Sequence, residues 1–332
     1  MKQIKDIDYI FLSTRIKAME RGLLSQERIE RMLDAPTVEE AAKVLTECGY
    51  SEMEEITANE LERVLGEQQQ KVMSDLSSGA PDRNLVDIFK LRYDYHNAKV
   101  LVKAEALETE QDQLLQGGGR YDPEALATDF RREDLSRCTD WFRRGIARAR
   151  EILGSTGDPQ QADFILDRAY FEEMSAIAAD TDSKFLRDYV ALAIDVANLR
   201  SCVRAARLGK GADFLNQVLV NGGSVSVRNL AMARGDELGN LFRLGSLSEA
   251  AAEGASKSAP GSGSLNEFER LCDNAVMSFL SDGRRVPFGA EPIIGYIFAR
   301  EAETTAIRTI ISGRMAGLDG NTIRQRLRRT YC

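Results

Sequence analysis

The sequence has 332 residues, 43% of them hydrophobic and 29% charged, and a formal net charge of −8. That length allows two or three domains of ordinary size, and that apolar content excludes a globally disordered chain. The negative charge argues against a nucleic-acid-binding protein, because the chain would approach phosphates against its own electrostatic field.

The chain is predicted to be all-α, since only 7 residues are proline and helix-favouring Ala, Leu, Glu and Arg are frequent. Thr37, followed three residues later by Glu40, predicts a capping box at the start of a short helix. Apolar periodicity predicts longer helices over residues 58–76, 85–107, 132–153 and 161–179. Glycine-rich segments predict loops over residues 116–123, 154–159 and 254–264, the last of them a mobile linker.

Two of the long helices share both apolar and polar residues. The first has an apolar stripe with spacings of three and four, formed by Ile88, Leu91, Tyr95, Ala98 and Val102. The same stripe recurs 101 residues later, formed by Tyr189, Leu192, Val196, Leu199 and Val203. The polar residues Asp94, Asn97 and Lys99 also recur, as Asp195, Asn198 and Arg200. A weaker third match includes Glu303 and Arg308, and a partial fourth includes Arg15.

The matched basic residues Arg15, Lys99, Arg200 and Arg308 are 84, 101 and 108 residues apart. These spacings far exceed the roughly 20–50 residues of solenoid repeats. We therefore interpret the chain as three copies of one helical repeat, over residues 1–110, 111–215 and 216–332. The segment after Arg308 is similar to the segment after Arg15. This similarity suggests the hypothesis that the two ends of the sequence complete each other around a closed, roughly three-fold body.

The repeated basic residues are expected to pair with carboxylates between helices. The alternative is ligand binding at a three-fold axis. Pairing is favoured because a single active site would not need four copies of one residue.

The sequence assigns no catalytic, cofactor-binding or metal-binding residue. The five cysteines are widely spaced, and His96 is the only histidine, which excludes a multi-histidine metal site. We expect His96 to be a hydrogen-bonded structural residue, because no nucleophile is placed beside it. The acidic pairs Asp6/Asp8 and Asp180/Asp182 are expected to be caps or solvated residues, with acid–base catalysis or magnesium binding as alternatives.

The glycine-rich motifs and the apolar segments do not indicate ligand binding or membrane insertion. The glycines at 117–119, 222–223 and 261–263 lack the spacing of a phosphate-binding loop and are expected to lie in turns or linkers. The first residues have no apolar segment of a signal peptide, and no window reaches 18 apolar residues without a charge. We therefore expect a soluble chain that can still dock on a membrane protein.

Arginines gather at two places. One group surrounds Trp141 and comprises Arg131, Arg132, Arg143, Arg144, Arg148 and Arg150. It could contact RNA, an acidic protein or solvent alone, and the acidity of the chain favours the last two. The other group, in a predicted last helix over 322–332, comprises Arg324, Arg326, Arg328 and Arg329. It is expected to complement the helix dipole in part and otherwise to form an interface, so that removing residues 323–332 would weaken assembly without unfolding the chain.

These segments together resemble one family, the C subunits of the prokaryotic V/A-type rotary ATPases, which are counterparts of the vacuolar d subunit. The resemblance lies in Tyr9-Ile-Phe-Leu-Ser-Thr-Arg-Ile-Lys-Ala-Met19, in Tyr93-Asp-Tyr-His-Asn-Ala-Lys-Val-Leu-Val-Lys103, in Asp195-Val-Ala-Asn-Leu-Arg200 and in Ile323-Arg-Gln-Arg-Leu-Arg-Arg-Thr-Tyr331. It extends over the whole chain and is weakest over 111–165 and 245–265.

The resemblance implies an all-α, funnel-shaped protein with three similar helical subdomains about a pseudo-three-fold axis. It implies a non-catalytic central-stalk connector that links the rotating shaft to the membrane rotor ring and transmits torque for H⁺ or Na⁺ transport and ATP synthesis. Such a protein would lie on the cytoplasmic face of the membrane, peripheral to it through the ring, with no cofactor, nucleic acid or small-molecule substrate. The alternatives are a generic helical adaptor outside any ATPase and a helical enzyme that uses scattered acids.

Overall fold

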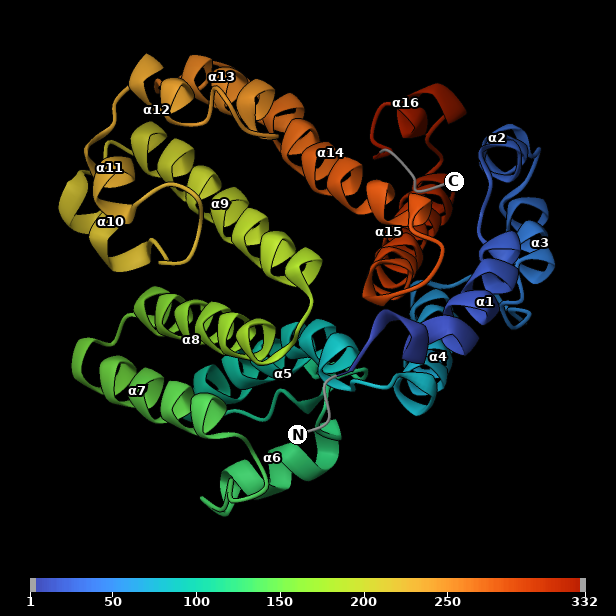
Figure 1. Ribbon diagram of the computed structural model, residues 1–332, viewed down its shortest axis with the longest axis horizontal. Coiled ribbons are helices and arrows are strands. Elements are labelled where there is room, and N and C mark those ends of the chain that lie inside the picture. The colour runs from blue at the N-terminus through green and yellow to red at the C-terminus, as the bar shows by residue number, and fades with distance from the viewer. Residues whose placement is uncertain (1–3, 329–332) are drawn as a thin grey trace. The chain divides into compact units, whose positions relative to one another are not determined.

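The computed structural model describes residues 4–328, and within this range every regular element is an α-helix or a short 3-10 helix. The all-α prediction is therefore confirmed. The chain divides into two compact units. We call residues 1–86 and 277–332 the terminal unit, and residues 87–276 the central unit. Both boundaries fall within helices, α5 and α14 (Figure 1).

The central unit contains ten helices or parts of helices. They are α5 (Asn84–Ala106), α6 (Pro123–Arg131), α7 (Asp140–Thr156), α8 (Pro159–Asp180), α9 (Lys184–Arg207), α10 (Ala212–Val218), α11 (Val227–Met232), α12 (Asp236–Leu241), α13 (Ser248–Ser256) and α14 (Asn266–Asp282). Helices α7 and α8 form a close hairpin, in which a Cβ atom at Gly145 would lie 2.9 Å from the Cβ atom of Ala169. Helix α9 packs against α8, α10, α11 and α13 (Figure 1).

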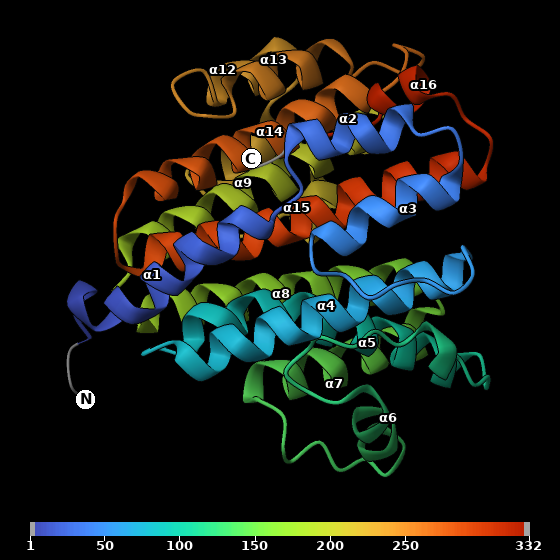
Figure 2. The same cartoon turned by 90° about the vertical axis from the view of Figure 1, so that its right-hand side faces the viewer.

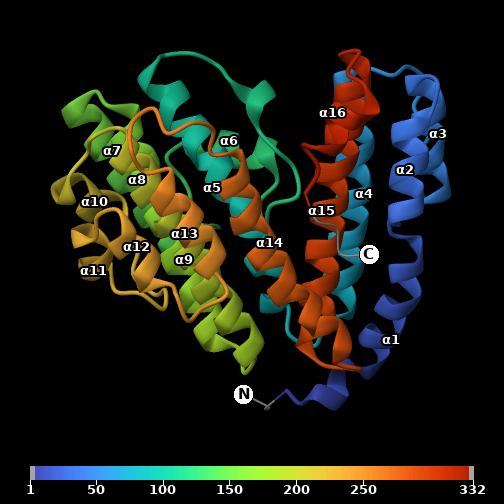
Figure 3. The ribbon, with the colours of Figure 1, turned by 90° about the horizontal axis from the view of Figure 1, so that it is seen from above.

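The terminal unit is built from both ends of the sequence. Its helices are α1 (Ile10–Met19), α2 (Gln26–Asp34), α3 (Val38–Glu47), α4 (Ala58–Gly79), α15 (Ala290–Met315) and α16 (Gly320–Arg324). Helix α15 packs against α1, α3, α4 and α16 (Figures 2 and 3). One apolar core includes Met32, Leu45 and Leu65 together with Ile307 and Ile323. The expectation that the two ends complete each other is confirmed at this level, whereas the three-fold arrangement and the three repeat boundaries stay predictions.

The predicted helices are mostly confirmed. The errors are in helix ends, within the arginine-rich segment before α7 and the glycine-rich segments after α7 and in α13. Thr37 caps α3 by accepting a hydrogen bond from the Glu40 N–H. The helix predicted over 132–153 starts only at Asp140, because the hydroxyl of Thr139 caps it there. The loop predicted over 154–159 shrinks to residues 157 and 158, since α7 continues to Thr156.

The predicted linker over 254–264 is wrong in its first three residues, which belong to α13. Gly254 is buried, and a Cβ atom there would lie 2.8 Å from both Phe268 and Val203. Glycine therefore permits close packing at this position, which composition alone cannot distinguish from flexibility.

Candidate functional site

Each repeated long helix carries a buried acid five positions before its basic residue. These acids are Asp94 on α5, Asp195 on α9 and Glu303 on α15, with exposures of 0, 4 and 4%. Each accepts a hydrogen bond from a backbone N–H in the loop that leads into a short helix. We call this arrangement the loop joint.

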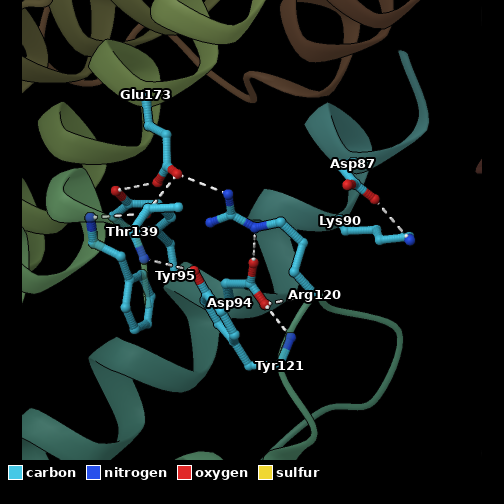
Figure 4. Close-up of polar contacts among 9 residues, drawn as sticks. Asp87, Lys90, Asp94, Tyr95, Arg120, Tyr121, Thr139 and Glu173 are labelled. Carbon is cyan, nitrogen blue, oxygen red and sulfur yellow. Dashed lines mark hydrogen bonds and ion pairs between the residues drawn. The ribbon is translucent and has the colours of Figure 1, made fainter. Parts of the chain in front are cut away.

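In the loop joint of α5, one carboxylate oxygen of Asp94 accepts the backbone N–H of Arg120 at 2.9 Å, and the other accepts its Nε–H at 2.6 Å (Figure 4). One turn along α5, the amide of Asn97 donates to the carbonyl of Gln116 and accepts from its N–H, both at 2.8 Å. A Cβ atom at Gly119 would lie closer than 3.0 Å to Asp94. Glycine at this position therefore lets the loop reach the carboxylate.

The loop joint of α9 reproduces these contacts. Asp195 accepts the N–H of Ser224 at 2.9 Å and its hydroxyl at 2.5 Å. Asn198 makes the same two-bond pairing with the backbone of Val220, at 2.8 and 2.9 Å. A Cβ atom at Gly223 would again meet the carboxylate at less than 3.0 Å. The loop residues of the two joints differ by 104 in number and the helix residues by 101.

The loop joint of α15 is formed by a loop from the other end of the sequence. Glu303 accepts the N–H of Leu24 at 2.8 Å, the Tyr50 hydroxyl at 2.6 Å and an Arg300 N–H at 2.9 Å. Leu24, Tyr121 and Val225 hold the same place in their loops, because each directly precedes the residue that caps the following short helix. The joint therefore recurs three times, once across the two ends of the sequence.

A wider polar network surrounds Arg120 (Figure 4). Its guanidinium also pairs with Glu173 of α8 at 2.7 Å, and Glu173 accepts the hydroxyls of Tyr95 at 2.8 Å and Thr139 at 2.7 Å. Burial raises the pKa of Asp94 to about 6, although Arg120 acts to lower it. Because the carboxylates are occupied by neighbouring donors and buried, the network is suited to fix α5, α7, α8 and the loop together and not to react with a substrate.

The repeated basic residues pair with carboxylates on other helices, as predicted. The ion pairs are Lys99–Asp167 at 2.6 Å, Arg200–Asp273 at 2.6 Å, Arg200–Glu269 at 2.6 Å, Arg308–Glu62 at 2.5 Å and Arg15–Asp75 at 2.8 Å. The partners of Lys99, Arg200 and Arg308 lie on α8, α14 and α4. Each of these three helices directly precedes a long helix of the repeat in the sequence, namely α9, α15 and α5.

The remaining candidates take structural positions. The Nε2–H of His96 donates to the carbonyl of Leu114 at 3.1 Å, as expected of a structural histidine. The acids of both predicted pairs, Asp6/Asp8 and Asp180/Asp182, are exposed. Among residues 4–328, no group of three His, Cys, Asp or Glu side chains is placed to hold a metal ion. None of the helices in that range combines the length and the apolarity needed to cross a bilayer.

The C-terminal arginines are less prominent than the sequence suggests. Helix α16 is only five residues long, Arg324 pairs with Glu30 at 2.5 Å, and Arg329 lies outside the described residues. Ile323 has no exposed surface and packs in the terminal core. Ile323 therefore belongs to the core and not to an interface, whereas the outcome of removing residues 323–332 stays a prediction.

The loop joints themselves were not predicted from the sequence. Arg120 and Glu173 were not among the residues that recur between the repeats, so the sequence did not single them out. The glycines next to the joints were predicted to lie in ordinary turns. The available signal was the pairing of two features, an Asp-x-x-Asn motif on the helix and a Gly-Gly step about 25 to 28 residues later. This combination occurs at 94–97 with 118–119, and again at 195–198 with 222–223.

Comparison with known proteins relates nearly the whole chain to one kind of protein. A family model described as "ATP synthase (C/AC39) subunit" matches residues 12–326. The chain is 23% identical to the C subunit of the V-type sodium ATPase of Enterococcus hirae, over 98% of this chain and 99% of that protein. It is 25% identical to the C subunit of the V-type ATP synthase of Thermus thermophilus, over 94% of this chain and 95% of that protein. It is also 25% identical to the C subunit of the A-type ATP synthase of Haloquadratum walsbyi, over 95% of this chain and 96% of that protein.

Proposed function

Because this chain belongs to the family of ATP synthase C/AC39 subunits, we propose that it is the non-catalytic central-stalk connector of a V/A-type rotary ATPase. It links the rotating shaft to the membrane rotor ring and transmits torque during H⁺ or Na⁺ transport and ATP synthesis. It lies on the cytoplasmic face of the membrane and is held there by the ring. Its partners are the shaft subunits and the ring.

The observation that supports this proposal is the recurrence of the loop joint. A body that transmits torque must resist bending, and loops are ordinarily the most compliant parts of a helical protein. Hydrogen bonds to a charged group are worth about 1.5–3 kcal/mol each, so the joints at Asp94, Asp195 and Glu303 hold loops that would otherwise fluctuate. The interhelical ion pair of Arg200 with Glu269 and Asp273 adds a further cross-connection.

Large apolar side chains left in solvent are candidates for the contacts with the shaft and the ring. Leu107 and Leu208 follow α5 and α9 at matched positions and are 68 and 70% exposed. In the terminal unit, Phe11 is 77% exposed and Ile7 63%. Exposed apolar groups of this size are typical of protein interfaces.

The test is photo-crosslinking in the assembled ATPase, with a benzophenone amino acid at position 11, 107 or 208 and a matched control at the exposed Arg243. We expect crosslinks from the first three positions to shaft or ring subunits, and none from position 243. We also expect ATP-driven ion transport to persist after a crosslink to the ring, since both partners rotate together. Crosslinks to stationary subunits, with arrest of ATP turnover, would show that the chain is not part of the rotor.

A further inference from the structure

None of the arginines in the segment around Trp141 takes part in a loop joint. Residues 131–150 contain seven arginines, no lysine and three acids, so this segment is positive in a chain with a net charge of −8. The inner face of α7, with Phe142 and Ala149 fully buried, packs on α8. The outer face carries Trp141, the only tryptophan of the chain, which is 40% exposed.

Trp141, Arg144 and Arg148 are spaced by three and four and form a stripe along this outer face. We call it the α7 stripe. The Arg144 guanidinium lies 5.9 Å from the centre of the Trp141 ring, and its side chain is 74% exposed. Within residues 4–328, Arg148 is exposed and makes no ion pair.

Four of the neighbouring arginines already pair with carboxylates. Their ion pairs are Arg131–Asp112, Arg137–Asp129, Arg143–Asp140 and Arg150–Glu105. Arg144 approaches Asp140 only at 3.6 Å, and that carboxylate is shared with Arg143. The two stripe arginines are therefore the cations of α7 with hydrogen-bonding capacity to spare.

We propose that the α7 stripe docks an acidic α-helix of another subunit of the ATPase complex. Carboxylates one turn apart on that helix match the spacing of Arg144 and Arg148, and each guanidinium can bind one of them with two hydrogen bonds. An apolar side chain of the partner covers the Trp141 ring. This inference rests on assembly into an ATPase complex and does not depend on the connector role.

The chemistry of the stripe favours a protein partner over a polyanion. Tryptophan and arginine are the residue types most often found at the energetic centres of protein interfaces. Extended polyanions such as RNA or an anionic membrane would also meet Glu133, Asp134 and Asp140 and the negative field of the whole chain. A single helix, in contrast, needs only the narrow strip that Trp141, Arg144 and Arg148 occupy.

The first experiment uses carbodiimide crosslinking of the purified ATPase complex, which joins a lysine amine directly to a carboxylate in contact with it. Arg144→Lys and Arg148→Lys preserve charge and place an amine in the stripe, and Arg243→Lys is the exposed control. We expect peptides that contain the lysine introduced at position 144 or 148 to be joined to Asp or Glu residues on one helix of another subunit. The control should give no such product. A normally assembled complex without these products would overturn the proposal.

The second experiment measures retention of that subunit after charge reversal. We expect Arg144→Glu/Arg148→Glu to increase its dissociation rate at least 10-fold, while the circular dichroism and the thermal unfolding midpoint of the isolated chain stay unchanged. Retention equal to that of the unmodified complex would contradict the inference. Charge-dependent binding of RNA or of phosphatidylglycerol vesicles to the stripe, with no loss of the subunit, would contradict it as well.

Discussion

The loop joint of α9 makes a sharp prediction for Gly223→Ala. The added methyl group would lie closer than 3.0 Å to a carboxylate oxygen of the buried Asp195, although the backbone at 223 is not left-handed. The loop must therefore move by roughly 1 Å, because the surrounding core is closely packed. That movement disrupts the bonds from the Ser224 N–H and hydroxyl to Asp195, which are 2.9 and 2.5 Å long. At about 1.5–3 kcal/mol for each bond to a charged group, we expect a loss of about 3 kcal/mol.

The assay combines urea unfolding with hydrogen exchange of the amides at residues 224 and 225. The control is Gly117→Ala, since a Cβ atom at Gly117 meets nothing within 4 Å. We expect less than about 0.5 kcal/mol of destabilisation there. Asp195→Ala removes the obstacle, so Gly223→Ala should cost under about 1 kcal/mol in that background, a non-additive result. Equal costs for both glycine variants, or the same cost with and without Asp195, would refute the reasoning.

Three further outcomes follow from the contacts described above. Burial raises the pKa of Asp94 from 3.8 to about 6, so the folded state binds the extra proton between these values and stability falls as the pH rises through this range. Urea unfolding should show wild type losing about 2 kcal/mol relative to Asp94→Asn between pH 4 and pH 7, and a gain would contradict the assignment. Arg200→Gln should cost about 1–3 kcal/mol because the side chain is 27% exposed and pairs with two acids, whereas Arg15→Gln, 43% exposed with one acid, should cost under about 1 kcal/mol. Thermal unfolding should rank them in that order, and similar losses would show that the number of partners is irrelevant. Ile323→Ala should cost about 2–4 kcal/mol by the same method, because Ile323 is fully buried. Arg326 is exposed, so Arg326→Ala should be nearly neutral. The reverse order would indicate that this segment is an interface and not part of the core.

Much of the fold was predictable because helical periodicity and capping act locally. The apolar stripe from Ile88 to Val102 placed α5 to within one residue at each end, and Thr37 marked the start of α3. The repeated basic residues also indicated interhelical pairing, since a charged residue that recurs in the same place has a recurring partner. The sequence could not identify the carboxylates that pair with these residues, because they are distant in the chain. The partner of Lys99 lies 68 positions away, and the two partners of Arg200 lie 69 and 73 positions away.

The buried network was beyond local reasoning for the same reason. Arg120 follows three glycines and reads as a loop residue, yet it connects Asp94 with Glu173. Gly254 shows the opposite error, because a sequence rich in Gly and Ser suggested disorder where close packing against Phe268 requires a small residue. In both cases the deciding contact is with a residue distant in sequence.

The joining of the first 86 residues with the last 56 also sets an order of events during synthesis. Helices α2 to α4 leave the ribosome well before α15, whose Ile307, Ile310 and Ile311 complete their core. At about 5–20 residues per second, roughly 10–50 s separate the two segments. Throughout that interval, while residues 87–276 are being synthesised, the nascent chain presents the apolar sides of α2 to α4 uncovered. The C-terminal helices are thus the last to emerge, and early termination of translation would leave a folded middle attached to an N-terminal segment prone to aggregation.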